Sequence, residues 1–139
     1  MFTLALLPPW EEWRTVTRFP AYEVSNLGRV RRGERILTAT RKTGRPGFAP
    51  YLVVKLCIHG RPRQVRLNRL VASVWLLPPP RGRRQVDHVN TDTMDNRARN
   101  LEWVSQGENQ RRSHAVHPRA RDERGRILAR AVVAEMRAA

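Results

Sequence analysis

The sequence predicts an α+β protein: a small antiparallel β-rich module, then a strand–loop–strand–helix module, then a helical tail. Three observations support this. Short segments that alternate apolar and polar residues fill the first part of the chain, and the apolar spacing becomes helical from Asn68. Three consecutive prolines at 78–80 end that helix, and a second set of short strands follows. The predicted modules are therefore 10–80 and 81–118, with the tail at 119–139.

In the first module, the strongest strand signal is the almost wholly apolar run 51–58. A turn containing His59 and Gly60 and an alternating run at 63–67 complete a predicted hairpin. The other elements expected here are short strands at 22–24 and 29–31, an exposed basic loop at 38–50 and an amphipathic helix at 68–77. We expect Trp10, Trp13 and Trp75 to pack in the core of this module.

The second module reads as a strand at 85–89, a polar loop at 90–99 and a strand at 101–104. Ser105 and Glu108 form an S-x-x-E capping box, which predicts a helix that begins near Gln106. Pro118 ends that helix. In the tail, the helical spacing of Leu128, Val132 and Met136 predicts one more helix.

The charge of the chain excludes a near-neutral domain as the starting hypothesis. Of 139 residues, 27 are Lys or Arg and 12 are Asp or Glu, which gives a formal net charge of +15. So basic a protein favours a polyanionic partner, and nucleic acid is the commonest one. Nearly all the basic residues are Arg, either because Arg binds phosphate and guanine in bidentate fashion or because of a GC-rich genome; composition leaves both explanations open.

Cysteine and hydropathy exclude several other classes. The single cysteine, Cys57, rules out an intramolecular disulfide and a zinc site built from several thiolates, so no structural zinc is expected. We expect Cys57 to be a small buried apolar side chain. No apolar stretch approaches the ~20 residues of a membrane span, and the N-terminal segment lacks the basic start of a secretory signal. The expected location is the cytoplasm.

A group of polar residues in the second module indicates a site that can bind a metal ion and catalyse a reaction. Asp87 and His88 are adjacent on the first strand, Asn100 precedes the second strand, and Asn109 lies just inside the capped helix. Asp87 and Asn109 offer the oxygen ligands that Mg²⁺ or Mn²⁺ accepts. Histidine is the side chain suited to proton transfer at physiological pH, so His88 can remove a proton from water. Adjacent strand residues point to opposite faces, so a shared site requires a twist or kink in the strand. Asn100 can clamp the polar loop through hydrogen bonds.

These residues match a known pattern. The runs Val86–Asp92, Asp95–Arg97, Asn100–Ser105 and Glu108–Asn109 resemble the HNH endonuclease motif, in the variant of phage and intron homing endonucleases where Asn replaces the last His. The spacing also agrees, since 12 positions separate His88 from Asn100, and 9 separate Asn100 from Asn109.

The resemblance implies a ββα-metal fold with one divalent ion, Mg²⁺ or Mn²⁺, and assigns a role to each residue. His88 is the general base, and Asn100 supports it structurally, so these two are the expected catalytic residues. Asp87 and Asn109 are the expected metal ligands. The family cleaves DNA to a 5′-phosphate and a 3′-hydroxyl, and a bacterial host cell, with a phage genome as one source of the gene, is the implied setting.

The first module carries a second resemblance. Residues 12–31, 51–56 and 69–72 are similar to the nuclease-associated DNA-binding module that precedes HNH domains in these enzymes. Asn68 departs from the family pattern, which usually has a His there. A strip of basic side chains in this module is expected to bind the DNA backbone; it consists of Arg29, Arg31, Arg32, Arg35, Arg41, Lys42 and Arg45.

The sequence therefore predicts a metal-dependent HNH endonuclease of the homing type that acts on double-stranded DNA as a monomer or weak dimer. One active site cuts one strand, so a monomer should nick. Two alternatives stay open: a non-catalytic DNA-binding protein derived from such a nuclease, and a basic RNA-binding protein. The tail at 119–139 is expected to be a basic extension or a truncated helix-turn-helix.

Overall fold

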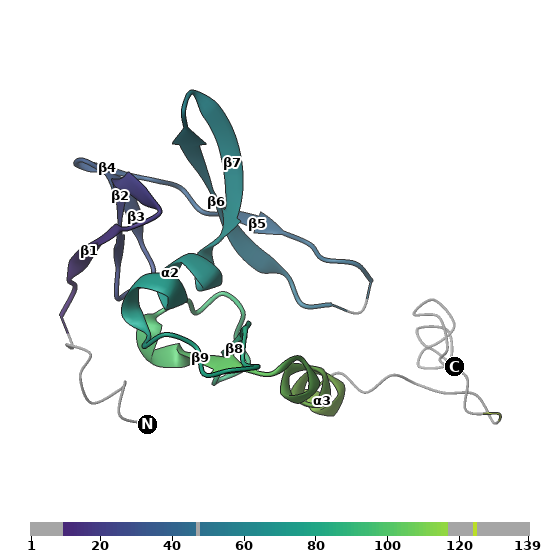
Figure 1. The fold of residues 1–139 in the computed structure, drawn as a ribbon. Helices are drawn as coiled ribbons and strands as arrows, with labels where there is room; N and C mark the ends of the chain where they lie inside the picture. Colours follow the sequence, from purple (N-terminus) through teal and green to yellow (C-terminus); the bar gives the residue numbers. More distant parts are fainter. Residues whose placement is uncertain (1–9, 47, 117–123, 125–139) are drawn as a thin grey trace.

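The computed structural model describes residues 10–46, 48–116 and 124, and Figure 1 shows the arrangement of their elements. The strands are β1 Trp13–Val16, β2 Phe19–Ser25, β3 Val30–Arg32, β4 Arg35–Ile36, β5 Thr40–Lys42, β6 Tyr51–Ile58, β7 Arg61–Arg66, β8 Gln85–His88 and β9 Leu101–Val104. The helices are α2 Leu67–Trp75, the 3₁₀ turn η1 Ala98–Asn100, and α3 Gln106–Val116. The α+β class predicted from the sequence is confirmed.

The strands form three antiparallel sheets, ordered β1-β2-β3-β4, β5-β6-β7 and β8-β9. Within the first sheet, Val24 of β2 pairs with Val30 of β3, and the turn between them is closed by a 3.1 Å hydrogen bond from the Gly28 N–H to the Ser25 carbonyl. Gly28 has a φ of +86°. Glycine adopts this left-handed region at little cost, and other residues do not, which explains why the turn contains a glycine.

Helix α2 joins the sheets into one core. Its buried residues are Leu67, Leu70, Val71, Ala72 and Trp75, which form one helical face. This face contacts strands of all three sheets, and Figure 1 shows α2 between the β1–β4 sheet and the β8–β9 pair. The apolar cluster around it includes Val24 of the first sheet, Leu56 of the second and Leu101 of the third. The boundary near residue 80 remains a prediction, but the two predicted modules share this core.

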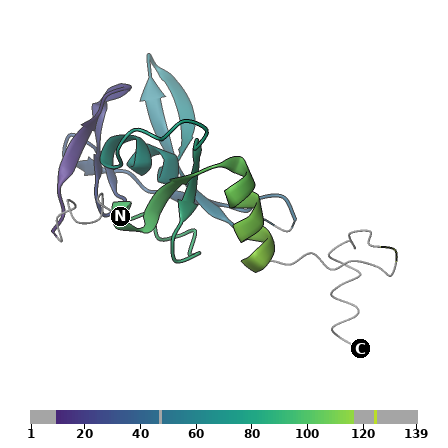
Figure 2. The ribbon, with the colours of Figure 1, turned by 60° about the horizontal axis from the view of Figure 1, so that its bottom comes forward.

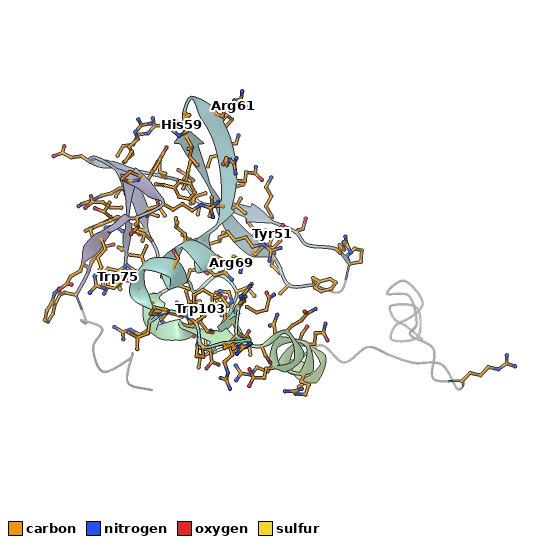
Figure 3. The ribbon with its side chains drawn as sticks, viewed as in Figure 1. Tyr51, His59, Arg61, Arg69, Trp75 and Trp103 are labelled. Carbon is orange, nitrogen blue, oxygen red and sulfur yellow. The ribbon has the colours of Figure 1, made fainter. Side chains whose placement is uncertain are left out.

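Trp75 and Trp103, labelled in Figure 3, hold the C-terminal end of α2 and the segment after it by hydrogen bonds as well as by packing. The Trp75 indole N–H donates to the Val24 carbonyl at 3.1 Å, which ties the end of α2 to β2. The Trp103 indole N–H donates to the Leu77 carbonyl at 3.0 Å, which ties the linker to β9. The Trp75 indole is buried, and a buried indole N–H needs a partner, whereas the Trp103 bond is exposed.

The capping box forms as predicted. The Glu108 N–H donates to the Ser105 hydroxyl at 3.1 Å, and the Ser105 N–H donates to the Glu108 carboxylate at 2.8 Å. These reciprocal bonds satisfy two of the N–H groups at the helix N-terminus that lack intrahelical partners. Helix α3 therefore starts directly at the end of β9, and Figure 2 shows it leading away from the first sheet.

Several local predictions were wrong. Residues 40–42 of the expected basic loop form β5, because they pair with the first three residues of β6. Cys57 is exposed, because β6 alternates and buries its neighbour Leu56 instead. Trp10 is 63% exposed rather than part of the core. The helix predicted in the tail lies outside the described residues. No helix in the described part of the chain has the length and apolar character to cross a membrane.

Candidate active site

The candidate site is built on the β8–β9 pair, the loop between the two strands, and α3. Antiparallel pairing sets Asp87 opposite Glu102 and His88 opposite Leu101. The loop from Val89 onward then has to return to β9 with several polar groups close to the core. Buried polar groups must be hydrogen-bonded, and the asparagines of the loop satisfy this requirement.

Asn100 closes the loop from within. Its Oδ1 accepts the Asn90 N–H at 3.0 Å, and its Nδ2 donates to Asn90 Oδ1 at 2.9 Å and to the Asp95 carbonyl at 2.8 Å. The Asn100 carbonyl accepts the Val89 N–H at 2.8 Å. Asn100, which directly precedes β9, is thus bonded to the start of the loop and to its middle at Asp95, as expected of a clamp. Its part in catalysis remains a prediction.

A salt bridge holds the loop from outside. The Arg97 guanidinium donates to Asp95 through Nε at 2.8 Å and through Nη2 at 2.7 Å. This bidentate pair, and the Asn90 Nδ2 that donates to the same carboxylate at 2.9 Å, hold the pKa of Asp95 below its ordinary value.

The imidazole ring of His88 contacts the loop between β8 and β9. The side chain is 7% exposed, and its Nε2 lies 2.9 Å from Oδ1 of Asn96, which is 5% exposed. The orientation of the Asn96 amide is fixed because its Nδ2 donates to the Thr93 and Met94 carbonyls, each at 3.4 Å. Asn96 therefore presents an oxygen to His88, and an amide oxygen only accepts. Nε2 must carry the proton.

This tautomer leaves Nδ1 of neutral His88 with its lone pair. Nδ1 has no hydrogen-bond partner among the described residues, and no buried side-chain nitrogen or oxygen in that part of the chain lacks one. Nδ1 is therefore neither fully enclosed nor occupied by a protein group. A ring held at one nitrogen, with an unprotonated second nitrogen that no described protein group occupies, is the arrangement a general base requires.

Asp87 contacts different groups from His88. Its Oδ1 accepts the His88 backbone N–H at 2.9 Å, and its Oδ2 accepts Nη1 of Arg112 on α3 at 3.0 Å. The same Arg112 nitrogen also pairs with Glu102 on β9. Glu102 and Asp87 together hold the pKa of the Arg112 guanidinium above its ordinary value. Arg112 thus fastens α3 to both strands beside the predicted metal ligand.

Asn109 precedes Arg112 on α3 by three residues, about 300° around the helix, so the two side chains leave neighbouring positions. Arg112 reaches Asp87 from this helix, and the role of Asn109 as a metal ligand stays a prediction. The first turn of α3 is fixed by the bond from the Asn109 N–H to the Ser105 carbonyl at 3.0 Å.

The donor chemistry fits a hard divalent ion. Asp87 supplies a carboxylate and Asn109 a neutral amide oxygen, which are ligands that Mg²⁺ and Mn²⁺ accept. Within the described residues, no group of three or more His, Cys, Asp and Glu side chains is arranged to hold an ion. Two protein ligands suit Mg²⁺, because this ion usually retains several waters and binds substrate phosphates.

Two of the predicted DNA-binding arginines, one directly before β3 and one within it, have acidic partners. Arg29 donates through Nε to Glu11 at 2.8 Å, and this contact lowers the pKa of Glu11 and raises that of Arg29. Arg31 donates to Glu23 at 2.7 Å, and its guanidinium lies 4.2 Å from the centroid of the Trp13 ring. Part of their charge is therefore already matched within the protein. The remaining members of the predicted strip are Arg32, Arg35, Arg41, Lys42 and Arg45, of which all but the half-buried Lys42 are exposed.

Sequence reasoning missed a second group of basic residues. Arg61, Arg63 and Arg66 of β7 are all exposed, and Lys55 of β6 is exposed on the neighbouring strand. Figure 3 shows Arg61 at the outer end of the β6–β7 hairpin. The signal was present, because basic residues recur along a predicted strand. The contact of Asn96 with His88 was also missed, because eight residues separate the two and no local pattern indicates the contact.

The strand–loop–strand–helix unit, with an acid–histidine pair at the end of its first strand, defines a ββα arrangement. The fold of the chain is similar to that of the HNH homing endonuclease I-HmuI, whose solved structure concerns DNA binding and cleavage. The TM-score is 0.62 at 22% identity, and the match covers 91% of this chain and 66% of that one.

Comparisons of the amino-acid sequence find relatives of the same kind. Residues 11–57 match the NUMOD4 motif. Two uncharacterised HNH endonucleases of Acanthamoeba polyphaga mimivirus are 36% identical over 121 residues and 25% identical over 107 residues, which covers 84% and 76% of this chain. The chain spans only 29% and 30% of the lengths of these relatives. The resemblance to HNH homing endonucleases predicted from the sequence is confirmed.

Proposed function

We propose that this chain is a DNA endonuclease of the HNH homing type that hydrolyses a phosphodiester bond. The observation that carries the proposal is the contact of His88 Nε2 with Asn96 Oδ1 at 2.9 Å, which fixes the ring and leaves Nδ1 without a protein partner among the described residues. Asp87 lies beside it, and Asn109 lies on the helix next to Asp87. Sequence similarity to HNH endonucleases and the shared fold support the assignment.

In the proposed reaction, Nδ1 of His88 takes a proton from a water molecule as the water oxygen attacks the phosphorus. The bond from phosphorus to O3′ breaks, and O3′ takes a proton from solvent, which gives a 5′-phosphate and a 3′-hydroxyl. Asp87 and Asn109 would hold one divalent ion, Mg²⁺ or Mn²⁺, which neutralises charge on the phosphate and the leaving oxygen. Asn100 keeps the loop closed, and a single site of this kind nicks one strand.

The first module would bind the duplex. We include the β7 arginines with the predicted strip, because exposed guanidinium groups contact phosphates and position a protein on DNA. The NUMOD4 match over 11–57 supports this use of the first module. Its contacts would be mostly to the DNA backbone. These residues would therefore contribute affinity for DNA and not recognition of a base sequence.

The test is incubation of the purified chain with supercoiled plasmid and Mg²⁺ or Mn²⁺, with EDTA as the control. We expect open-circle product only with metal. His88→Ala should abolish cleavage and leave DNA affinity nearly unchanged, because a general base acts in the transition state. Added imidazole should partly restore cleavage by His88→Gly, since it replaces the missing ring.

Other outcomes discriminate among the alternatives. Linear product would indicate paired active sites, as in a dimer. Cleavage by His88→Ala at the wild-type rate would refute the proposed mechanism. Tight binding of duplex DNA without cutting, on substrates that include candidate target sites, would favour a non-catalytic DNA-binding protein, and preference for structured RNA in competition would favour the RNA-binding alternative.

A further inference from the structure

We propose that the β2–β3 turn of the first module is a positioning element for His88, so that the module expected to bind DNA also sets the geometry of the general base. The inference rests on the proposed function only in giving His88 a catalytic role. The physical connection runs from the turn to Asn96, and from Asn96 to the imidazole ring.

The turn itself is rigid. Asn26 is 4% exposed; its Oδ1 accepts the Glu12 N–H at 2.8 Å, and its Nδ2 donates to the Trp10 carbonyl at 2.8 Å. On the other side of the turn, the Ser25 hydroxyl accepts the Arg29 N–H at 3.0 Å. Side-chain bonds of this kind hold a turn in one conformation. The segment before β1 and the start of β3 therefore brace it from two sides.

The turn touches the active-site loop at two points. The Ala98 N–H donates to the Asn26 carbonyl at 2.8 Å. Gly28 packs directly on the backbone of Asn96, so close that an added Cβ would lie 2.8 Å from the Asn96 carbonyl oxygen and 3.0 Å from its carbonyl carbon. Only glycine fits here without moving one backbone or the other. Asn96 is thus seated against the first module.

Asn96 transmits this placement to His88. Its backbone rests on Gly28, its Nδ2 is held by the Thr93 and Met94 carbonyls, and its Oδ1 lies 2.9 Å from Nε2 of His88. A shift of the Asn96 backbone would move the one oxygen that fixes the ring and its tautomer. Catalysis is sensitive to such displacements, since a misplacement of about 1 Å can cost on the order of a hundredfold in rate.

The chain offers matched controls. Gly33 and Gly82 also have positive φ, +57° and +81°, but a Cβ at either would meet nothing within 4 Å. Alanine at these positions and at Gly28 carries a similar backbone cost, and only Gly28→Ala pushes on Asn96. The comparison therefore separates strain in a turn from displacement of the loop.

We would measure single-turnover cleavage at saturating DNA, DNA Kd, and the ¹⁵N signals of the His88 ring in the protein without DNA or metal. For Gly28→Ala we expect cleavage to fall about ten- to hundredfold with little change in Kd, and the His88 ring to lose its single Nε2–H tautomer. Gly33→Ala and Gly82→Ala should match the wild type in all three. Equal rates and unchanged ring signals in Gly28→Ala would overturn the proposal.

Variants of Asn96 keep the test decisive if Gly28→Ala does not fold. Asn96→Ala removes the acceptor and should give mixed tautomers and slow cleavage, whereas Asn96→Asp retains an acceptor and should restore the Nε2–H form. A ring in the same tautomer in Asn96→Ala would refute the positioning role. The ring signals do not depend on activity, so they report on positioning even if the wild-type chain proves not to cleave.

Discussion

At the scale of single residues, Arg112 places a positive charge directly beside Asp87, the predicted metal ligand. Its guanidinium lies 3.0 Å from Asp87 and pairs also with Glu102, and the three side chains are partly exposed. A cation at that position neutralises the carboxylate that is predicted to hold the metal. In the protein without DNA, Arg112 and a divalent ion therefore compete for Asp87.

Replacing this arginine should favour the ion. We expect Arg112→Gln to bind Mn²⁺ about three- to tenfold more tightly than the wild type in titration calorimetry without DNA, because a unit charge about 4 Å away contributes about 1 kcal/mol in a water-like dielectric. Arg111→Gln is the matched control, because it removes the same charge from an exposed neighbour on the same helix. Weaker Mn²⁺ binding by Arg112→Gln would show instead that Arg112 holds Asp87 in place for the ion.

At the scale of elements, α3 depends on its capping box, because the helix has little apolar surface to anchor it. Ser105→Ala removes the acceptor for the Glu108 N–H, and we expect the free energy of unfolding to fall by about 1 kcal/mol in denaturant titrations. Ser113→Ala, an exposed position later in the same helix, should change it little. An equal effect of the two variants would contradict a specific role for the cap.

Glu108 of α3 makes the stability of the fold depend on pH, and the direction of this dependence can be stated. The backbone N–H of Ser105 holds the pKa of Glu108 below its ordinary value. A carboxyl whose folded pKa is lowered stabilises the fold above its unfolded pKa and loses that effect as the pH falls. The difference in stability between the wild type and Glu108→Ala, which lacks the carboxylate, should therefore shrink as the pH falls from 7 to about 3, below the ordinary glutamate pKa.

The elements themselves were mostly predictable, and the reasons are local. The S-x-x-E box, the apolar run of β6 and the helical spacing of α2 each follow from periodicity or from a motif within a few residues. The contacts that complete the site do not follow from any local pattern. Asn96 binds His88 eight residues away, and Gly28 meets Asn96 from another sheet, so neither contact leaves a short-range pattern. Cys57 was misplaced because an apolar run does not show which of its residues face outward.

At the scale of the whole molecule, the net charge of +15 is not uniformly available to a polyanion. Arg29 and Arg31 already pair with Glu11 and Glu23. The arginines of β7 lie on an exposed strand of the second sheet, and Figure 3 shows the tip of its hairpin far from α3. We therefore expect β7 to contribute more to the electrostatic part of DNA binding than the paired arginines of the first sheet.

Salt dependence tests this directly. Each phosphate contact contributes about 0.9 to the slope of log K against log salt on duplex DNA. Arg63→Gln should lower that slope by about 0.9, whereas Arg29→Gln should lower it by less, because Glu11 already neutralises part of the Arg29 charge and is released when Arg29 is removed. Fluorescence anisotropy over a salt series measures both slopes. A larger loss for Arg29→Gln would place the duplex on the first sheet, and a flat salt response of the wild type would argue against nucleic acid as the partner.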